Sequence, residues 1–119
     1  MRGINKKVLK EFNLVSAIET EKGREALIDY LKPLVRSVAD SYLEMHVKEK
    51  SFFLSKEDKK KALEAGWKYV HLGAKKYFEK MALMEKGEIN PYSFSDYITW
   101  FIKQGVHEYL WHIRRLGDT

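Results

Sequence analysis

Residues 92–107 read YSFSDYITWFIKQGVH, and this stretch decides the fold that we expect of the chain. Apolar side chains recur there every three or four residues, at Ile98, Ile102 and Val106. This spacing places them on one face of a helix. Ser93 and Ser95 are alternative N-caps, and Gly117 follows the last apolar turn. The stretch therefore predicts an amphipathic helix that runs to about Arg115.

The other face of this predicted helix carries aromatic side chains where a solvent-facing helix usually carries Lys and Glu. It holds Tyr97, Trp100, Gln104, His107 and Trp111, with Lys103 beside them. Aromatic rings can stack on unpaired bases, an amide can pair with an adenine edge, and a lysine can neutralise a phosphate. Aromatic residues in helices also fill cores, so both interpretations stay open. Phe101 lies beside the apolar stripe and is open to burial, whereas Tyr97 and Trp100 are harder to bury.

Two further helices are predicted upstream by the same apolar spacing. The first covers about residues 5–20 and ends at Gly23. The second starts near Arg24 and carries Pro33 inside its pattern. Because proline removes a backbone hydrogen bond, we expect a bend or a break there. Residues 48–54, which include Phe52 and Phe53, are expected to form a connection.

A third helix is predicted between these two and the C-terminal one. Ser55 and Asp58 resemble a capping box, so the helix should begin at Lys56 and continue to about Met84. Residues 86–92 contain Gly87, Asn90 and Pro91 and are expected to form a turn. Together the patterns predict an all-α fold of four helices in a single domain, residues 1–119.

Composition narrows the function classes. The 119 residues include no cysteine, which excludes disulfide, zinc-thiolate and cysteine-nucleophile chemistry. The net charge of +5 favours polyanionic partners. Neither a signal peptide nor a membrane-length apolar stretch is found, so we expect a cytoplasmic protein without membrane contact. The four histidines do not form a metal-binding pattern, and no catalytic motif occurs. We therefore expect no metal, no cofactor and no enzymatic activity.

The C-terminal stretch resembles region 2 of the bacterial sigma-70 family, in the helix that melts promoter DNA. The family pattern runs Phe-Ser-x-Tyr-x-Thr-Trp-Trp-Ile-Arg-Gln-x-Ile. Ten positions here match it or are conservatively replaced without a gap: Phe94, Ser95, Tyr97, Thr99, Trp100, Phe101, Ile102, Lys103, Gln104 and Val106. The similarity extends over about residues 14–113, with an apparent insertion at 81–88.

This resemblance implies a DNA-binding domain that acts in transcription initiation by recognising or melting −10-like promoter DNA. Tyr97 would stack on the flipped adenine of the −10 element. Trp100 and Phe101 would wedge against the last paired base, and Gln104 would contact that base pair. His107 replaces a small polar residue that assists base reading. The path of the non-template strand would be lined by Tyr92, Phe94 and Lys103.

The resemblance also implies a polymerase-binding surface on the third helix, and here the sequence departs from the family. An acidic and amide cluster normally docks on the clamp coiled coil of the polymerase β′ subunit. Residues 60–66 retain only Glu64 of that character, and Lys68 and Lys75 add positive charge. Like charges oppose association. Leu63, Glu64 and Lys68 are the candidate partner-binding residues on this helix, with the RNA polymerase core as a candidate partner.

Three hypotheses remain open from the sequence. The first is a stand-alone region 2-like domain that binds single-stranded or melting DNA. The second is a diverged sigma-like module that binds RNA polymerase or another protein without reading promoter DNA, since aromatic residues also anchor protein interfaces. The third is a helical bundle whose similarity reflects ancestry alone. The third hypothesis predicts that Tyr97 and Trp100 are buried.

Overall fold

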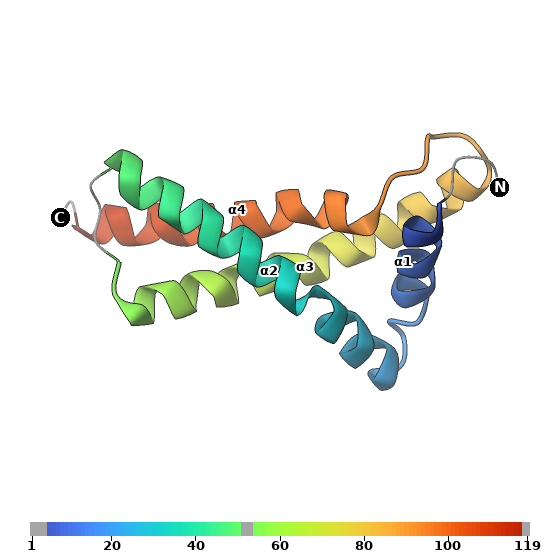
Figure 1. Cartoon of the computed structure of the whole chain (residues 1–119), viewed down its shortest axis with the longest axis horizontal. Helices are drawn as coiled ribbons and strands as arrows, with labels where there is room; N and C mark the ends of the chain where they lie inside the picture. The colour runs from blue at the N-terminus through green and yellow to red at the C-terminus, as the bar shows by residue number, and fades with distance from the viewer. Residues whose placement is uncertain (1–4, 51–53, 118–119) are drawn as a thin grey trace.

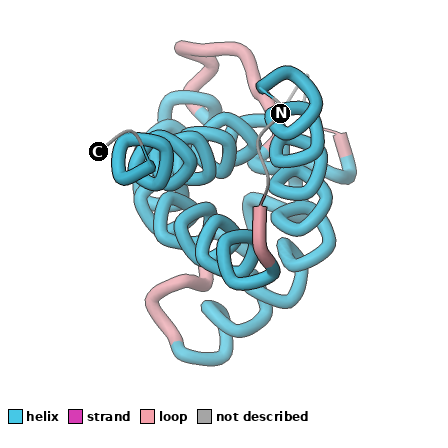
Figure 2. Tube along the Cα trace, turned by 90° about the vertical axis from the view of Figure 1, so that its left-hand side faces the viewer, coloured by secondary structure: helices cyan, strands magenta, loops and turns pink. Residues whose placement is uncertain are grey.

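The computed structural model describes residues 5–50 and 54–117, and these form four helices. They are α1 (Lys6–Ser16), α2 (Glu21–Lys50), α3 (Lys56–Glu85) and α4 (Phe94–Gly117). No strand occurs within the described ranges, as Figure 2 also shows. The all-α prediction with four helices is therefore confirmed. No helix in these ranges is apolar enough over a sufficient length to cross a membrane.

The helices form a scaffold centred on the α3–α4 pair. These two helices run antiparallel along the long axis of the molecule, and α2 crosses them diagonally (Figure 1). The short helix α1 lies at the end of the pair where α3 turns into α4 (Figure 1). All four helices contribute fully buried side chains to one core, including Val15, Leu31, Tyr77 and Ile102.

Glycines allow α3 and α4 to approach each other closely. A Cβ atom added to Gly105 would lie 2.4 Å from the carbonyl oxygen of Ala65, which belongs to the α3 backbone. A Cβ atom on Gly73 would lie 2.4 Å from Cδ1 of Ile98. The first contact is with backbone atoms, so a larger side chain at position 105 would push the helices apart. The second contact is with side chains, so Gly73 leaves room for Ile98 and Phe101 to pack against α3.

Two predicted helix starts, with three candidate capping serines, can be compared with the structure. The capping box is confirmed, because Ser55 Oγ accepts from the Asp58 N–H at 3.0 Å and Asp58 accepts in return from the Ser55 N–H. Ser93 caps α4, since its Oγ accepts from the Asp96 N–H at 3.1 Å. Ser95, the alternative cap, has another role that is described below.

The boundary between the first two helices differs from the prediction. α1 ends at Ser16, and α2 begins at Glu21, before Gly23. Thr20 starts α2 by accepting from the Gly23 N–H at 2.9 Å. A Cβ atom on Gly23 would lie 1.8 Å from the carbonyl oxygen of Ala17. Gly23 is thus a close-approach residue inside α2 and does not terminate a helix.

The remaining differences concern helix lengths. α2 continues through Pro33, so a break there is excluded, and it extends to Lys50. Residues 48–50, expected in a connection, are therefore helical, and Phe52 and Phe53 lie outside the described residues. The predicted turn after α3 is confirmed, with Gly87 at φ 78°. The 81–88 segment is the end of α3 together with this turn.

The glycine contacts predict opposite outcomes for two matched substitutions. Gly105→Ala should lower the free energy of unfolding by about 1–3 kcal/mol, because the added methyl group meets backbone atoms that cannot move aside. Gly66→Ala is the control, since its Cβ atom would lie 3.4 Å from Ile102 Cγ2, an ordinary contact. It should be neutral or stabilising by up to about 1 kcal/mol. Denaturant titration of both variants checks this, and equal losses would contradict the close-packing account.

Candidate nucleic-acid interface

A buried carboxylate holds the start of α4 in place. Glu11 of α1 has no exposed surface. Its Oε1 accepts from the Ser95 N–H at 3.1 Å, and the Ser95 hydroxyl also donates to its other oxygen. The hydroxyl of Tyr30 donates to Glu11 at 2.8 Å. Acceptors at a helix N-terminus satisfy unpaired N–H groups and complement the helix dipole. Glu11 thus joins α1, α2 and α4 where the aromatic segment begins.

Beneath this segment lies a cluster of aromatic rings centred on Tyr77 of α3. The Tyr77 side chain is fully buried, and its hydroxyl donates to the backbone oxygen of Tyr92 at 2.7 Å. Its ring lies edge-on to Phe94 and Phe12, with centroid distances of 5.1 and 5.9 Å. Burial, and then the nearby charge of Glu11, raise the pKa of Tyr77 well above its ordinary value. The cluster forms a floor of closely packed rings under the N-terminal half of α4.

Phe94 belongs to this floor. It was predicted to line the path of a DNA strand, but the structure leaves none of its side chain exposed. Phe101 was predicted to wedge against the last paired base or to be buried, and it is only 6% exposed. The centroid of its ring lies 5.2 Å from that of Tyr97. Phe101 is also edge-on to Trp100 at 5.0 Å. Phe94 therefore packs against Tyr77, and Phe101 packs against Tyr97 and Trp100.

Above the floor, Tyr92, Tyr97 and Trp100 form what we call the aromatic surface. Tyr92 and Tyr97 are half-buried and stack on each other, with centroids 5.6 Å apart and an interplanar angle of 26°. Trp100 is 58% exposed. Burying an indole usually contributes favourably to stability, so an exposed one on a well-packed helix is unusual. The exposure of Trp100 is opposite to what the ancestry-only hypothesis predicts.

Charged and polar groups surround the aromatic surface. Lys103 and Gln104 are exposed one turn further along α4. Lys76 of α3 places its Nζ 5.9 Å from the ring centroid of Phe101, which adds a second cation. Sequence reasoning missed Lys76 because its position depends on how α3 aligns with α4. Two acidic groups are also present. Asp96 is exposed on α4. Glu79 lies near enough to Tyr97 that its charge, after burial, raises the pKa of that tyrosine.

His107 lies on the same exposed face and is tied to α2. Its Nδ1 is 2.6 Å from the hydroxyl oxygen of Tyr42, and the two rings meet edge-on at 6.1 Å. One turn beyond, Trp111 is 55% exposed. A stripe of exposed side chains therefore follows α4 from Trp100 to Trp111, with residues 100, 103, 104, 107 and 111 on it.

The three predicted partner-binding residues do not share one environment. Leu63 is half-buried and packs against the core, whereas Glu64 and Lys68 are exposed. Lys68 lines a shallow groove of about 330 Å³ between α3 and α4, together with Trp111. The structure therefore brings Lys68 close to the far end of the α4 stripe. Among the described side chains, no three acidic or histidine groups come together in a way that could hold a metal ion.

The C-terminal half of α4 is fastened to α3 by two hydrogen bonds. The Tyr109 hydroxyl donates to Asp58 at 3.0 Å, and the Tyr69 hydroxyl donates to Glu108. Hydrogen bonds, first from Ser55 and then from Tyr109, lower the pKa of Asp58. Burial, and then the Asp58 carboxylate, raise the pKa of Tyr109 to about 12. The same contact therefore favours charged Asp58 and neutral Tyr109.

The Tyr109 contact predicts a dependence of stability on alkaline pH. The pKa of Tyr109 is higher in the folded state than the ordinary value of 10.0, so its contribution is complete below pH 10 and is lost as the pH rises toward about 12. Tyr109→Phe removes that contribution. The free energy of unfolding should therefore fall less between pH 9 and pH 11.5 in the variant than in the parent chain. Denaturant titrations at both pH values test this, and parallel losses would contradict it.

Comparisons with models of protein families, with curated proteins and with solved structures returned no match to this chain. The resemblance to sigma-70 region 2 therefore remains a prediction from the sequence.

Proposed function

We propose that the chain is a sigma-70 region 2-like domain that binds single-stranded or melting −10-like promoter DNA in transcription initiation. The observation that carries this proposal is the exposure of Trp100 in the middle of the matched motif. Core packing does not account for this indole. Base stacking does, because every base offers a π-face and each stack contributes roughly 1–3 kcal/mol.

The aromatic surface suits unpaired bases more than a closed duplex. A base placed on the Tyr92–Tyr97 pair would extend a stack that already exists. Trp100 is about one helical turn from Tyr97, so it can meet a neighbouring base or the end of the duplex. The buried rings of Phe94 and Phe101 keep these side chains in place. Such preorganisation lowers the entropy lost on binding.

Polar groups on the same face can supply the remaining contacts. Lys103 and Lys76 can neutralise phosphates, and Gln104 can reach the edge of an adenine. Flipping a base costs a few kcal/mol, so stacking and phosphate contacts are needed together. Asp96 and Glu79 oppose close approach of a phosphate backbone near Tyr97. We therefore infer that bases, and not phosphates, dominate the contacts at that end.

A protein-interaction module is the second candidate, in which the domain binds the RNA polymerase core or another protein without reading DNA. It is favoured by Trp111, a second exposed indole that lies outside the sigma-like motif and beside Lys68. Exposed tryptophans are frequent anchors of protein interfaces. DNA binding should weaken steeply with added salt, whereas an interface built on Trp111 should persist.

The two exposed tryptophans provide a matched test of the DNA-binding proposal. Trp100→Ala should weaken binding to a labelled −10-like single strand roughly tenfold or more, because one base stack is lost. Trp111→Ala removes an equally exposed indole outside the motif and should change the affinity by less than about twofold. Fluorescence anisotropy of the labelled strand measures both effects.

A scrambled strand and the closed duplex are the controls for this experiment. The proposal requires a preference for the −10-like strand that Trp100→Ala removes while thermal unfolding stays unchanged. Equal binding of all three nucleic acids, or none, would overturn it. If only Trp111→Ala weakens binding, the DNA interface lies at the other end of α4.

A further inference from the structure

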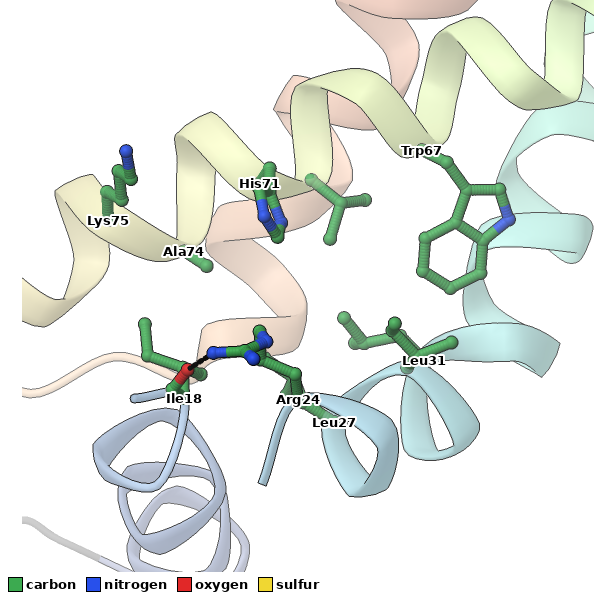
Figure 3. Close-up of a pocket in the computed structure, with 10 residues that line it drawn as sticks. Ile18, Arg24, Leu27, Leu31, Trp67, His71, Ala74 and Lys75 are labelled. Atoms are coloured by element: carbon green, nitrogen blue, oxygen red, sulfur yellow. Dashed lines mark hydrogen bonds between the residues drawn. The ribbon is translucent and has the colours of Figure 1, made fainter. Parts of the chain in front are cut away.

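A cavity of about 490 Å³ is lined by none of the motif residues of α4. It is formed between α2 and α3, with Ile18 of the α1–α2 connection at one end and Trp67 at the other (Figure 3). Seven of its ten lining side chains are apolar, and none is acidic. Its volume is in the range of pockets that hold small organic molecules. None of the aromatic-surface residues lines it.

Two basic side chains approach each other at the Ile18 end of the cavity. Arg24 extends from α2 and His71 from α3, and their polar groups face the same space (Figure 3). Arg24 is held in position because its Nη1 donates to the backbone oxygens of Ile18 at 3.1 Å and Glu19 at 3.3 Å. These bonds use one of its terminal nitrogens.

Lys75 also borders the cavity, but it has a different environment. It borders a neighbouring groove that contains Glu19 and Glu79, and its amine turns away from the cavity in Figure 3. We therefore assign no direct role to Lys75. The polar end of the cavity consists of Arg24 and His71, and the apolar end consists of Leu27, Leu31, Trp67 and Val70.

We propose that this cavity binds a small apolar molecule that carries one carboxylate. The carboxylate lies against Arg24 and His71, where the guanidinium donates in the planar geometry that suits carboxylates and the imidazole donates a further hydrogen bond. The apolar part lies between Leu31 and Trp67 and removes their surfaces from water. A cationic or uncharged head group would leave the Arg24 guanidinium without a counter-charge, so the site discriminates by charge.

Isothermal titration calorimetry with decanoate and with decyltrimethylammonium tests this proposal, since the two probes share a chain and differ in head-group charge. Decanoate should bind with one-to-one stoichiometry and at least about tenfold more tightly than the ammonium probe. His71→Glu places a carboxylate beside the head group and should weaken decanoate binding at least about tenfold. His112→Glu makes the same change at an exposed position outside the cavity and should have no effect.

Two further variants separate loss of binding from loss of structure. Arg24→Gln should weaken decanoate binding while its helical circular-dichroism signal and its unfolding midpoint remain those of the parent chain. Ile28→Trp narrows the apolar end of the cavity and should weaken decanoate binding with the same two signals unchanged. Ile28 is already 41% exposed, so a larger ring there can be accommodated while it blocks the tail. Equal affinity for the two probes, unchanged binding in His71→Glu, or no heat with either probe would overturn the proposal.

Discussion

The hydrogen bonds that Glu11 accepts from Ser95 and Tyr30 hold the start of α4 against α1 and α2. A carboxylate without exposed surface is costly to bury unless its oxygens are paired, and here each oxygen has a donor. This contact fastens the first turn of α4, whose start is capped by Ser93. It also places the backbone of Tyr92 where the Tyr77 hydroxyl can bond to it. The position of the aromatic surface depends on the hydrogen bonds to Glu11 and on the bond between Tyr77 and Tyr92.

The glycines of the α3–α4 pair have a complementary role. Gly105 allows the α4 backbone to approach the α3 backbone, and Gly73 leaves room on α3 for the side chains of Ile98 and Phe101. With the buried rings filling this space, Trp100 remains outside the core. The opposite face of α4 is fully buried, so the exposure of Trp100 does not result from poor packing of the helix. This is why we interpret it as a binding residue.

Local patterns predicted much of this fold. The capping box at Ser55 and the apolar stripe of α4 were correct because both depend on residues a few positions apart. Gly23 was misread, since its contact with Ala17 is visible only once the chain turns back on itself. The pairing of Lys76 with Phe101 and the cavity beside His71 involve different helices. Such contacts depend on how helices align, which hydrophobic periodicity does not specify. The motif in α4 was identified by its resemblance to sigma-70 region 2. The burial of Phe94 was not predicted, because it depends on the contact with Tyr77 of α3.

The central claim is that a base stacks on Trp100, and the emission of that indole reports it directly. A chain in which Trp67 and Trp111 are replaced by phenylalanine retains Trp100 as its single tryptophan. Titration with an unlabelled −10-like strand should quench its fluorescence saturably, and a scrambled strand should quench it less at the same concentration. Binding of the −10-like strand with unchanged Trp100 emission would contradict the account, because the strand would then be held without contact to this residue.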